Sequence, residues 1–245
     1  MKKVSSLLIF ILLSINTFAV TTIPKLDMTI GNTETPDDLV TSLQVLLILT
    51  ILSLAPSIII MTTSFVRIVI VFHFVRQAIG LQSTPPNQVM VGLSLILTFF
   101  VMKPTFNDIT SNAINPYLER KINQEQFYKN LESPLKNFML KQTKEKDLEL
   151  FLKISKEPAP KSRMETNFWT VLPSFVLSEL TRGFEMGILI YIPFIIIDMI
   201  VSTVLMSLGM MMLPPVMISM PFKLLLFVMV DGWALIIESL VKSFN

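Results

Sequence analysis

No charged residue occurs between Leu39 and Val66, and this run of 28 residues limits most strongly how the chain can fold. A helix of that length, at about 1.5 Å per residue, is long enough to cross the roughly 30 Å hydrocarbon core of a bilayer. A second apolar region covers residues 168–241. Hydrophobic residues make up 52% of the 245-residue chain and charged residues only 16%. A lone water-soluble globule is therefore excluded, because its interior could not cover so much apolar surface.

Residues 1–19 have the three parts of a secretory signal peptide, namely a positive start, an apolar core and small residues before a cleavage site. Lys2 and Lys3 supply the charge, and cleavage is predicted after Ala19. The alternative is an uncleaved membrane anchor, for which the apolar core is short. Residues 20–38 are predicted to form an extended polar segment outside the cytoplasm.

The remainder of the first apolar region, up to residue 102, is predicted to form a helical hairpin. Its long uncharged helix is followed by basic residues, which the positive-inside rule places at the cytoplasmic face. They are Arg67, His73 and Arg76. A turn at 84–87 then leads into a second apolar helix over 88–102, which is short for a membrane span.

Residues 103–167 differ from the rest of the chain, since they hold 12 of its 20 basic and nine of its 18 acidic residues. Apolar side chains recur there at helical spacing among the charges, which predicts amphipathic helices. The segment is predicted to be a polar α-helical insert on the periplasmic side. Its lysines do not contradict this, because the positive-inside rule governs short loops and not longer domains.

The second apolar region, residues 168–245, is predicted to form another hairpin, so the fold class is all-α. Helices are expected over 174–191, 194–208 and 221–241, with a connection at 209–220. Prolines are expected to break or bend the apolar helices, because each removes a backbone hydrogen bond. These positions are Pro56, Pro193, Pro214, Pro215 and Pro221.

Charged residues inside the second hairpin are candidates for function, because an unpaired charge at membrane depth is costly. Glu179, Arg182 and Glu185 follow one another at helical spacing, which predicts local pairing of the arginine with both acids. If the hairpin folds back near residue 213, Asp198 lies level with Lys223 and Asp231. A structural Asp198–Lys223 pair is one interpretation, and a proton or ion relay at Asp198 is the other.

Six methionines occur within 15 residues, and three of them are consecutive: Met206, Met210, Met211, Met212, Met217 and Met220. Methionine is unbranched and polarisable, so it adapts to changing neighbours. Consecutive helical residues point about 100° apart, so Met210–Met212 cannot share one helix face, whereas in a loop they could line a single opening. Ordinary packing and a deformable seal are the two interpretations.

Enzymatic chemistry is disfavoured by what the sequence lacks. It has no cysteine and one histidine, and it contains no phosphate-binding glycine motif and no nucleophile elbow. No catalytic residue, cofactor, metal site or nucleic-acid partner is expected.

Several segments resemble the FliP family of flagellar biosynthetic proteins. They are LAPSIIIMTTSFVRIVIVF at 54–72, TPPNQVMVGL at 84–93, PFIIIDM at 193–199, LGMMMLPP at 208–215, PFKLLLFV at 221–228 and VDGW at 230–233. The charged segment SELTRGFEMG at 178–187 departs from the family pattern, which suggests that Arg182 and Glu185 form a pair particular to this sequence.

The resemblance implies a core subunit of the type III protein export gate in the bacterial inner membrane, at the flagellar basal body. Five copies would assemble with FliQ-like and FliR-like subunits, other export-apparatus proteins and inner-membrane lipid. The pore would pass unfolded flagellar proteins, and Met210, Met211 and Met212 would seal it when closed. The helices would form bent hairpins.

Three alternatives stay open. One is the equivalent subunit of a virulence injectisome, which the signal peptide and the long insert disfavour. Another is an ion-coupled transporter of small solutes that uses Asp198 and Asp231, with substrate bound at helix breaks. The third is an assembly scaffold without a pore.

Overall fold

The computed structural model describes residues 36–81, 83–156, 160–210 and 213–244, in which every regular element is a helix. The all-α prediction is confirmed. Contacts divide the chain into two compact units, residues 1–50 and 51–245. Helix α2 (Pro36–Met61) is continuous across that boundary. The predicted signal peptide and residues 20–35 lie outside the described residues, whereas residues 36–38 begin α2 and are not extended.

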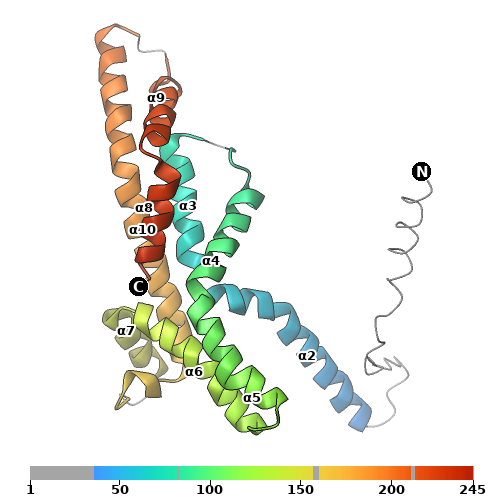
Figure 1. The fold of residues 1–245 in the computed structure, drawn as a ribbon. Coiled ribbons are helices and arrows are strands. Elements are labelled where there is room, and N and C mark those ends of the chain that lie inside the picture. Colours follow the sequence, from blue (N-terminus) through green and yellow to red (C-terminus); the bar gives the residue numbers. More distant parts are fainter. Residues whose placement is uncertain (1–35, 82, 157–159, 211–212, 245) are drawn as a thin grey trace, which may run out of the picture. The chain divides into compact units, whose positions relative to one another are not determined.

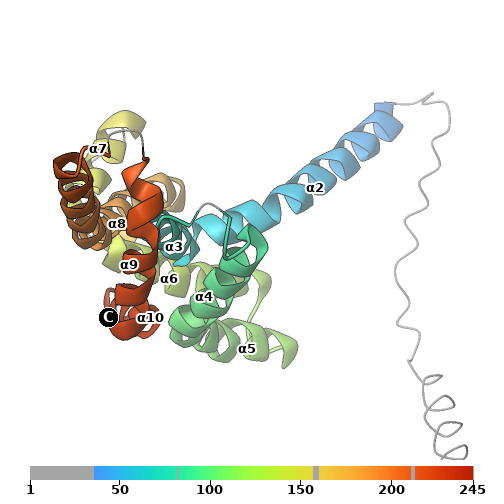
Figure 2. The same ribbon diagram turned by 90° about the horizontal axis from the view of Figure 1, so that it is seen from above.

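Helix α3 (Phe65–Ile79) is the centre of the second unit. It packs against α4 (Asn87–Ile109), α8 (Phe168–Ser207) and α9 (Pro215–Met229), as Figure 2 shows from above. Its apolar side chains are the middle of the larger core. The helix ends at Gly80, whose φ of 87° lets its N–H bond back to the Gln77 carbonyl.

Helix α8 is 40 residues long and runs beside α3 (Figure 1). Two glycines one turn apart, Gly183 and Gly187, face α3. A Cβ atom on Gly187 would lie 2.4 Å from Cδ2 of Phe74, and one on Gly183 would lie 3.1 Å from Cγ2 of Ile70. Because these positions carry no side chain, the two helices approach closely.

The polar insert folds as helices packed on the first half of α8. After the π-helical turn η2 (Thr110–Ile114) and α5 (Asn115–Leu118) come α6 (Gln124–Gln142), α7 (Glu145–Ser155) and the 3₁₀ turn η3 (Arg163–Glu165). Asn123 begins α6 with a reciprocal capping box to Gln126. Helices α6, α7 and α8 share a second apolar core around Met139, Val171 and Phe175.

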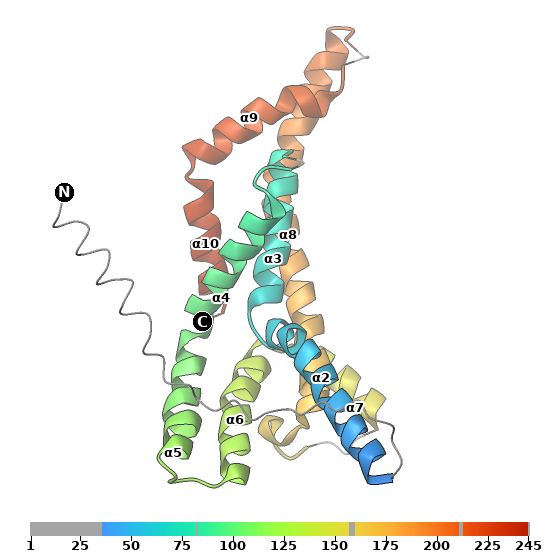
Figure 3. The ribbon, with the colours of Figure 1, turned by 90° about the vertical axis from the view of Figure 1, so that its right-hand side faces the viewer.

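The last two helices, α9 and α10 (Gly232–Lys242), meet at a bend of 64° (Figure 3). The prediction of one helix over 221–241 is therefore wrong. Asp231 takes a left-handed conformation with φ of 51°, which interrupts the α-helix at that point. Pro214 and Pro215 occupy the N-cap and first helical positions of α9, where a missing N–H costs nothing.

Three of the prolines predicted to break helices lie inside continuous ones. Pro56 lies within α2, Pro193 within α8 and Pro221 within α9, so the predicted break between 191 and 194 is wrong. Helix α4 likewise continues past Lys103 and Pro104 to Ile109, beyond the predicted end at 102. A proline removes a single N–H donor, and the other backbone bonds of a long apolar helix hold it together.

Helix α2 ends five residues before the uncharged run does. Three described helices are long and apolar enough to cross a membrane: Leu43–Met61, Asn87–Leu118 and Phe168–Ser207. The bent pair α9–α10 would form a fourth, broken span. These helices fit a membrane-associated protein.

Candidate functional site

Helices α8 and α9 form the hairpin that carries the predicted charge pair. The Nζ atom of Lys223 lies 2.6 Å from Oδ2 of Asp198, and the hydroxyl of Ser219 donates to Oδ1 of Asp198 at 2.5 Å. The Lys223 side chain is 3% exposed and that of Asp198 is 27% exposed. Both carboxylate oxygens thus have donors, and the buried ammonium has its counter-charge.

The same two helices also form an open apolar groove of about 450 Å³. Its lining is aliphatic and aromatic: Ile197, Ile200, Val201, Val204, Leu205, Ile218 and Phe222. The neighbouring outer faces of the hairpin are also apolar and exposed. Much of the described surface at this end of the hairpin is therefore suited to lipid or to apolar protein.

The methionine cluster lies around the tip of the same hairpin. Its exposed members are Met206, Met210 and Met217. Met220, in contrast, packs near Gly80, where an added Cβ would lie 3.7 Å from its Cγ. Met211 and Met212 lie outside the described residues. Of the three methionines of the predicted seal, the structure therefore describes only Met210, which is 46% exposed.

A second buried charge cluster surrounds Arg67. Its Nε donates to Oε2 of Glu179 at 2.9 Å, Nη2 donates to Oε1 of the same carboxylate, and both side chains are fully buried. The ring of Phe244 covers the guanidinium, with Cζ 3.8 Å from the ring centroid. Arg67 was predicted to lie at the cytoplasmic face, and the structure shows that its side chain is buried inside the protein.

The predicted local pairing of Arg182 with its neighbouring acids is also wrong. Arg182 donates to Oε1 of Gln142 at 2.8 Å, while Glu179 is taken by Arg67. Glu185 instead pairs with Lys144 of the α6–α7 turn at 2.7 Å. For Glu179 the partner from another helix is favoured, because its bidentate buried contact with Arg67 is stronger than an exposed pair along a single helix.

Asp231 does not join the Asp198–Lys223 pair. It is exposed at the bend between α9 and α10. Within the described ranges, no group of three His, Cys, Asp or Glu side chains could hold a metal ion.

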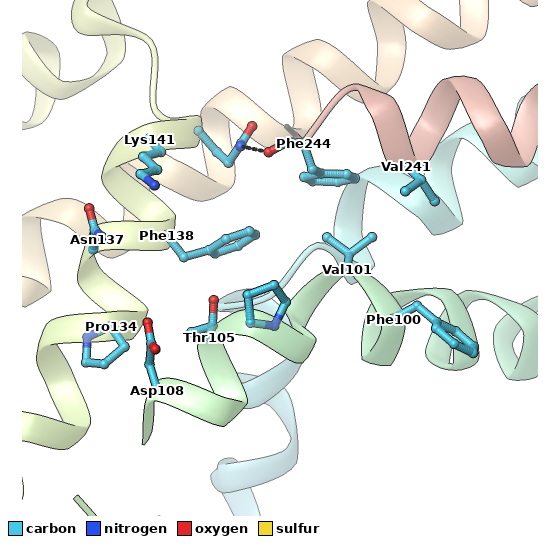
Figure 4. A pocket seen from close by; sticks show the side chains of 12 residues that line it. Phe100, Val101, Thr105, Asp108, Pro134, Asn137, Phe138, Lys141, Val241 and Phe244 are labelled. Carbon is cyan, nitrogen blue, oxygen red and sulfur yellow. Dashed lines mark hydrogen bonds between the residues drawn. The ribbon is translucent and has the colours of Figure 1, made fainter. Parts of the chain in front are cut away.

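A cavity of about 370 Å³ lies beside the Arg67 cluster, between α4, α6 and the residues after α10 (Figure 4). Phe138 and Phe244 form one wall, with ring centroids 6.4 Å apart, and Val101 and Thr105 of α4 lie opposite. Asp108 and Lys141 are charged and exposed at its edge. The shape of this cavity therefore depends on the position of residues 241–244.

Most of this chain is similar in sequence to known proteins. Residues 48–240 match the FliP family. The chain belongs to the FliP family. A flagellar biosynthetic protein FliP from Bacillus subtilis is 51% identical over 215 residues, which are 88% of this chain and 97% of that protein. One from Aquifex aeolicus is 47% identical over 230 residues, covering 93% and 95% of the two chains.

FliP family membership identifies the chain as a flagellar biosynthesis component, and its apolar helices fit association with a membrane. The matched region contains the α8–α9 hairpin with its Asp198–Lys223 pair, and it contains the Arg67–Glu179 pair. Phe244, which covers the Arg67 guanidinium, follows the matched region.

The Arg67 cluster was not predicted from the sequence. Two further acceptors of Arg67, Gln142 and Ser243, carry no signal by themselves, since either residue type is ordinary on a protein surface. The sequence feature that could have indicated this cluster is Arg67 itself, a lone arginine directly after 28 uncharged residues. An acid in the other apolar region, Glu179, was the natural partner to consider.

Proposed function

We propose that this FliP family chain is a core, pore-forming subunit of the flagellar type III protein export gate. Five copies assemble with FliQ-like and FliR-like subunits in the inner membrane, at the flagellar basal body. Unfolded flagellar proteins pass through the pore, and other parts of the export apparatus supply the energy. The chain itself has no enzymatic role.

The observation that carries this proposal is the family match together with an uncharged stretch that includes the ends of α8 and α9 and the connection between them, residues 208–214. Residues 199–222 contain no charged side chain, and the described methionines near the tip are exposed at Met206, Met210 and Met217. Flexible thioether side chains can close around chains of different shape and reclose when the pore is empty. Met210, Met211 and Met212 are therefore the proposed seal.

The seal is tested by changing all three residues of Met210–Met212 to Ala in cells that express the assembled gate. Smaller side chains should leave the closed pore open to ions and small solutes, measured as conductance or solute uptake. Met199→Ala is the matched control, because Met199 is exposed on α8 outside the connection. Uptake in the triple variant equal to wild type would contradict the seal and would favour a scaffold without a pore.

The proposed topology has the mature N-terminus and residues 103–167 in the periplasm. Similarity to flagellar biosynthetic proteins FliP supports the flagellar gate over the equivalent injectisome subunit. An ion-coupled transporter is less well supported, because Asp198 is held by both Lys223 and Ser219. Protease added to the periplasm should cut within 103–167 if the topology holds.

A further inference from the structure

The insert and the end of α10 meet at one buried guanidinium. From α6 of the insert, Oε1 of Gln142 accepts from Nη2 of Arg67 at 3.0 Å. From the residue after α10, the carbonyl oxygen and Oγ of Ser243 accept from Nη1 at 3.0 and 2.9 Å. Two segments 100 residues apart in sequence thus share a single donor group.

Every N–H of Arg67 has an acceptor. A guanidinium carries five, and here two go to Glu179, one to Gln142 and two to Ser243. Because Arg67 is fully buried, water cannot replace an acceptor that is lost. Removing one acceptor therefore shifts the guanidinium. This shift also disturbs the hydrogen bonds to the acceptors that remain.

Phe244 adds a direct link between the same two segments. Its carbonyl oxygen accepts from Nε2 of Gln142 at 2.9 Å, the bond drawn as a dashed line in Figure 4. Its ring packs on the guanidinium of Arg67 and beside Phe138 of α6. Gln142 thus accepts from Arg67 and donates to the chain end, which fixes the orientation of its amide.

We propose that Arg67 is a positioning residue that couples docking of the polar insert on α8 to docking of the segment 241–244. A disturbance of α6 at Gln142 releases the end of α10, and loss of the end of α10 loosens α6. Helix α10 begins at the Asp231 bend, directly after the helix that carries Lys223. The cluster therefore connects the insert with the α8–α9 hairpin, and it does so whether or not the chain forms a pore.

The absence of cysteine allows a direct test with single introduced thiols. Leu240 on α10 is buried, so the Leu240→Cys thiol should react slowly with a maleimide in the purified full-length chain. Adding Gln142→Ala should raise the labelling rate at least several-fold. Lys141→Ala is the matched control on α6, since Lys141 is exposed and makes none of these bonds with Arg67.

A second thiol separates local release from general unfolding. Val75→Cys lies in the middle of α3 and is fully buried, so it should stay protected when Gln142→Ala exposes position 240. Equal labelling at position 240 with and without Gln142→Ala overturns the proposal. Equal rises at 75 and 240 also overturn it, because the change would then be global.

Thermal stability provides an independent measure of the coupling. Gln142→Ala and Ser243→Ala should each lower the melting temperature, and the double variant should lower it by less than the sum. In an Arg67→Lys background, where one ammonium replaces the five-donor fork, the two shifts should become additive. Additive shifts in the wild-type background would show that Arg67 does not couple the segments.

Discussion

Arg67 and Glu179 show at the level of single residues how a charge can be kept inside an apolar protein. Removing two charges from water costs several kcal/mol for each ion, and only good geometry with full hydrogen bonding offsets that cost. Here the carboxylate takes two donors from the guanidinium, and the remaining three donors have acceptors. The stability of the pair depends on both partners being present.

Removing one partner should therefore be far more harmful than removing an exposed one. We expect Glu179→Ala to lower the free energy of unfolding by about 3–5 kcal/mol, since it leaves a buried cation without counter-charge. Glu238→Ala is the control, because Glu238 and Lys242 form an exposed pair whose charges stay in water when one partner is removed. Denaturant unfolding in detergent would measure both, and similar values would show that the buried pair contributes little.

The Asp198–Lys223 pair makes a related prediction inside the α8–α9 hairpin. We expect Asp198→Ala to lower the yield of assembled complex, because Lys223 would remain buried without its carboxylate. Asp198→Asn should retain more assembly, since an amide oxygen can still accept from Ser219. Native gels would measure assembly, and motility would report export. Full assembly of Asp198→Ala with loss of export would favour the ion-relay interpretation.

At the scale of elements, the close packing of α3 on α8 organises the second unit. It requires two positions on α8 without side chains, Gly183 and Gly187, under Ile70 and Phe74 of α3. The ring of Phe74 also meets Phe184 edge to face, with centroids 5.5 Å apart. The Ile70 and Phe74 side chains pack directly on the α8 backbone at these positions, which leaves little room for a methyl group.

Gly187→Ala should consequently destabilise the protein, although alanine is the better helix former. The new Cβ would need to move the Phe74 ring, and overpacking of this kind costs about 1–3 kcal/mol. Gly92→Ala on α4 is the matched control, because nothing lies within 4 Å of its Cβ position. That control should be neutral or stabilising by up to about 1 kcal/mol. A stabilised Gly187→Ala variant would contradict the packing argument.

At the scale of the whole molecule, much of the apolar surface of the described residues is left uncovered by the other described residues. In the most apolar 18 residues of Leu43–Met61 none is buried, and in those of Phe168–Ser207 only 11% are buried. Surfaces of this size need lipid or apolar protein as neighbours. The helices are thus folded for an environment that one chain alone does not provide.

Sizing the protein after detergent extraction tests the proposed assembly at this scale. The export-gate proposal expects one large particle that contains FliQ-like and FliR-like subunits, because the exposed faces are then covered by protein. A small-solute transporter would be found without these subunits. Recovery of the chain only as a single copy, with export intact, would contradict the proposal.

Sequence alone determined the properties that depend on local order along the chain. Runs without charge predicted apolar helices, apolar side chains at helical spacing among charges predicted the amphipathic helices of the insert, and family motifs led to the export apparatus. Helix ends were predicted less well, because a proline such as Pro193 weakens a helix by one bond and does not decide whether the helix continues.

Only the tertiary structure decided which charges meet. Arg182 had acids within one turn on its own helix, yet it contacts Gln142, and Glu179 contacts an arginine 112 residues away. The bend at Asp231 also depends on packing, since a Cβ on Gly232 would lie 2.4 Å from the Phe227 ring. Such choices rest on the small difference between burying one set of partners and another, and that difference exists only once the helices are side by side.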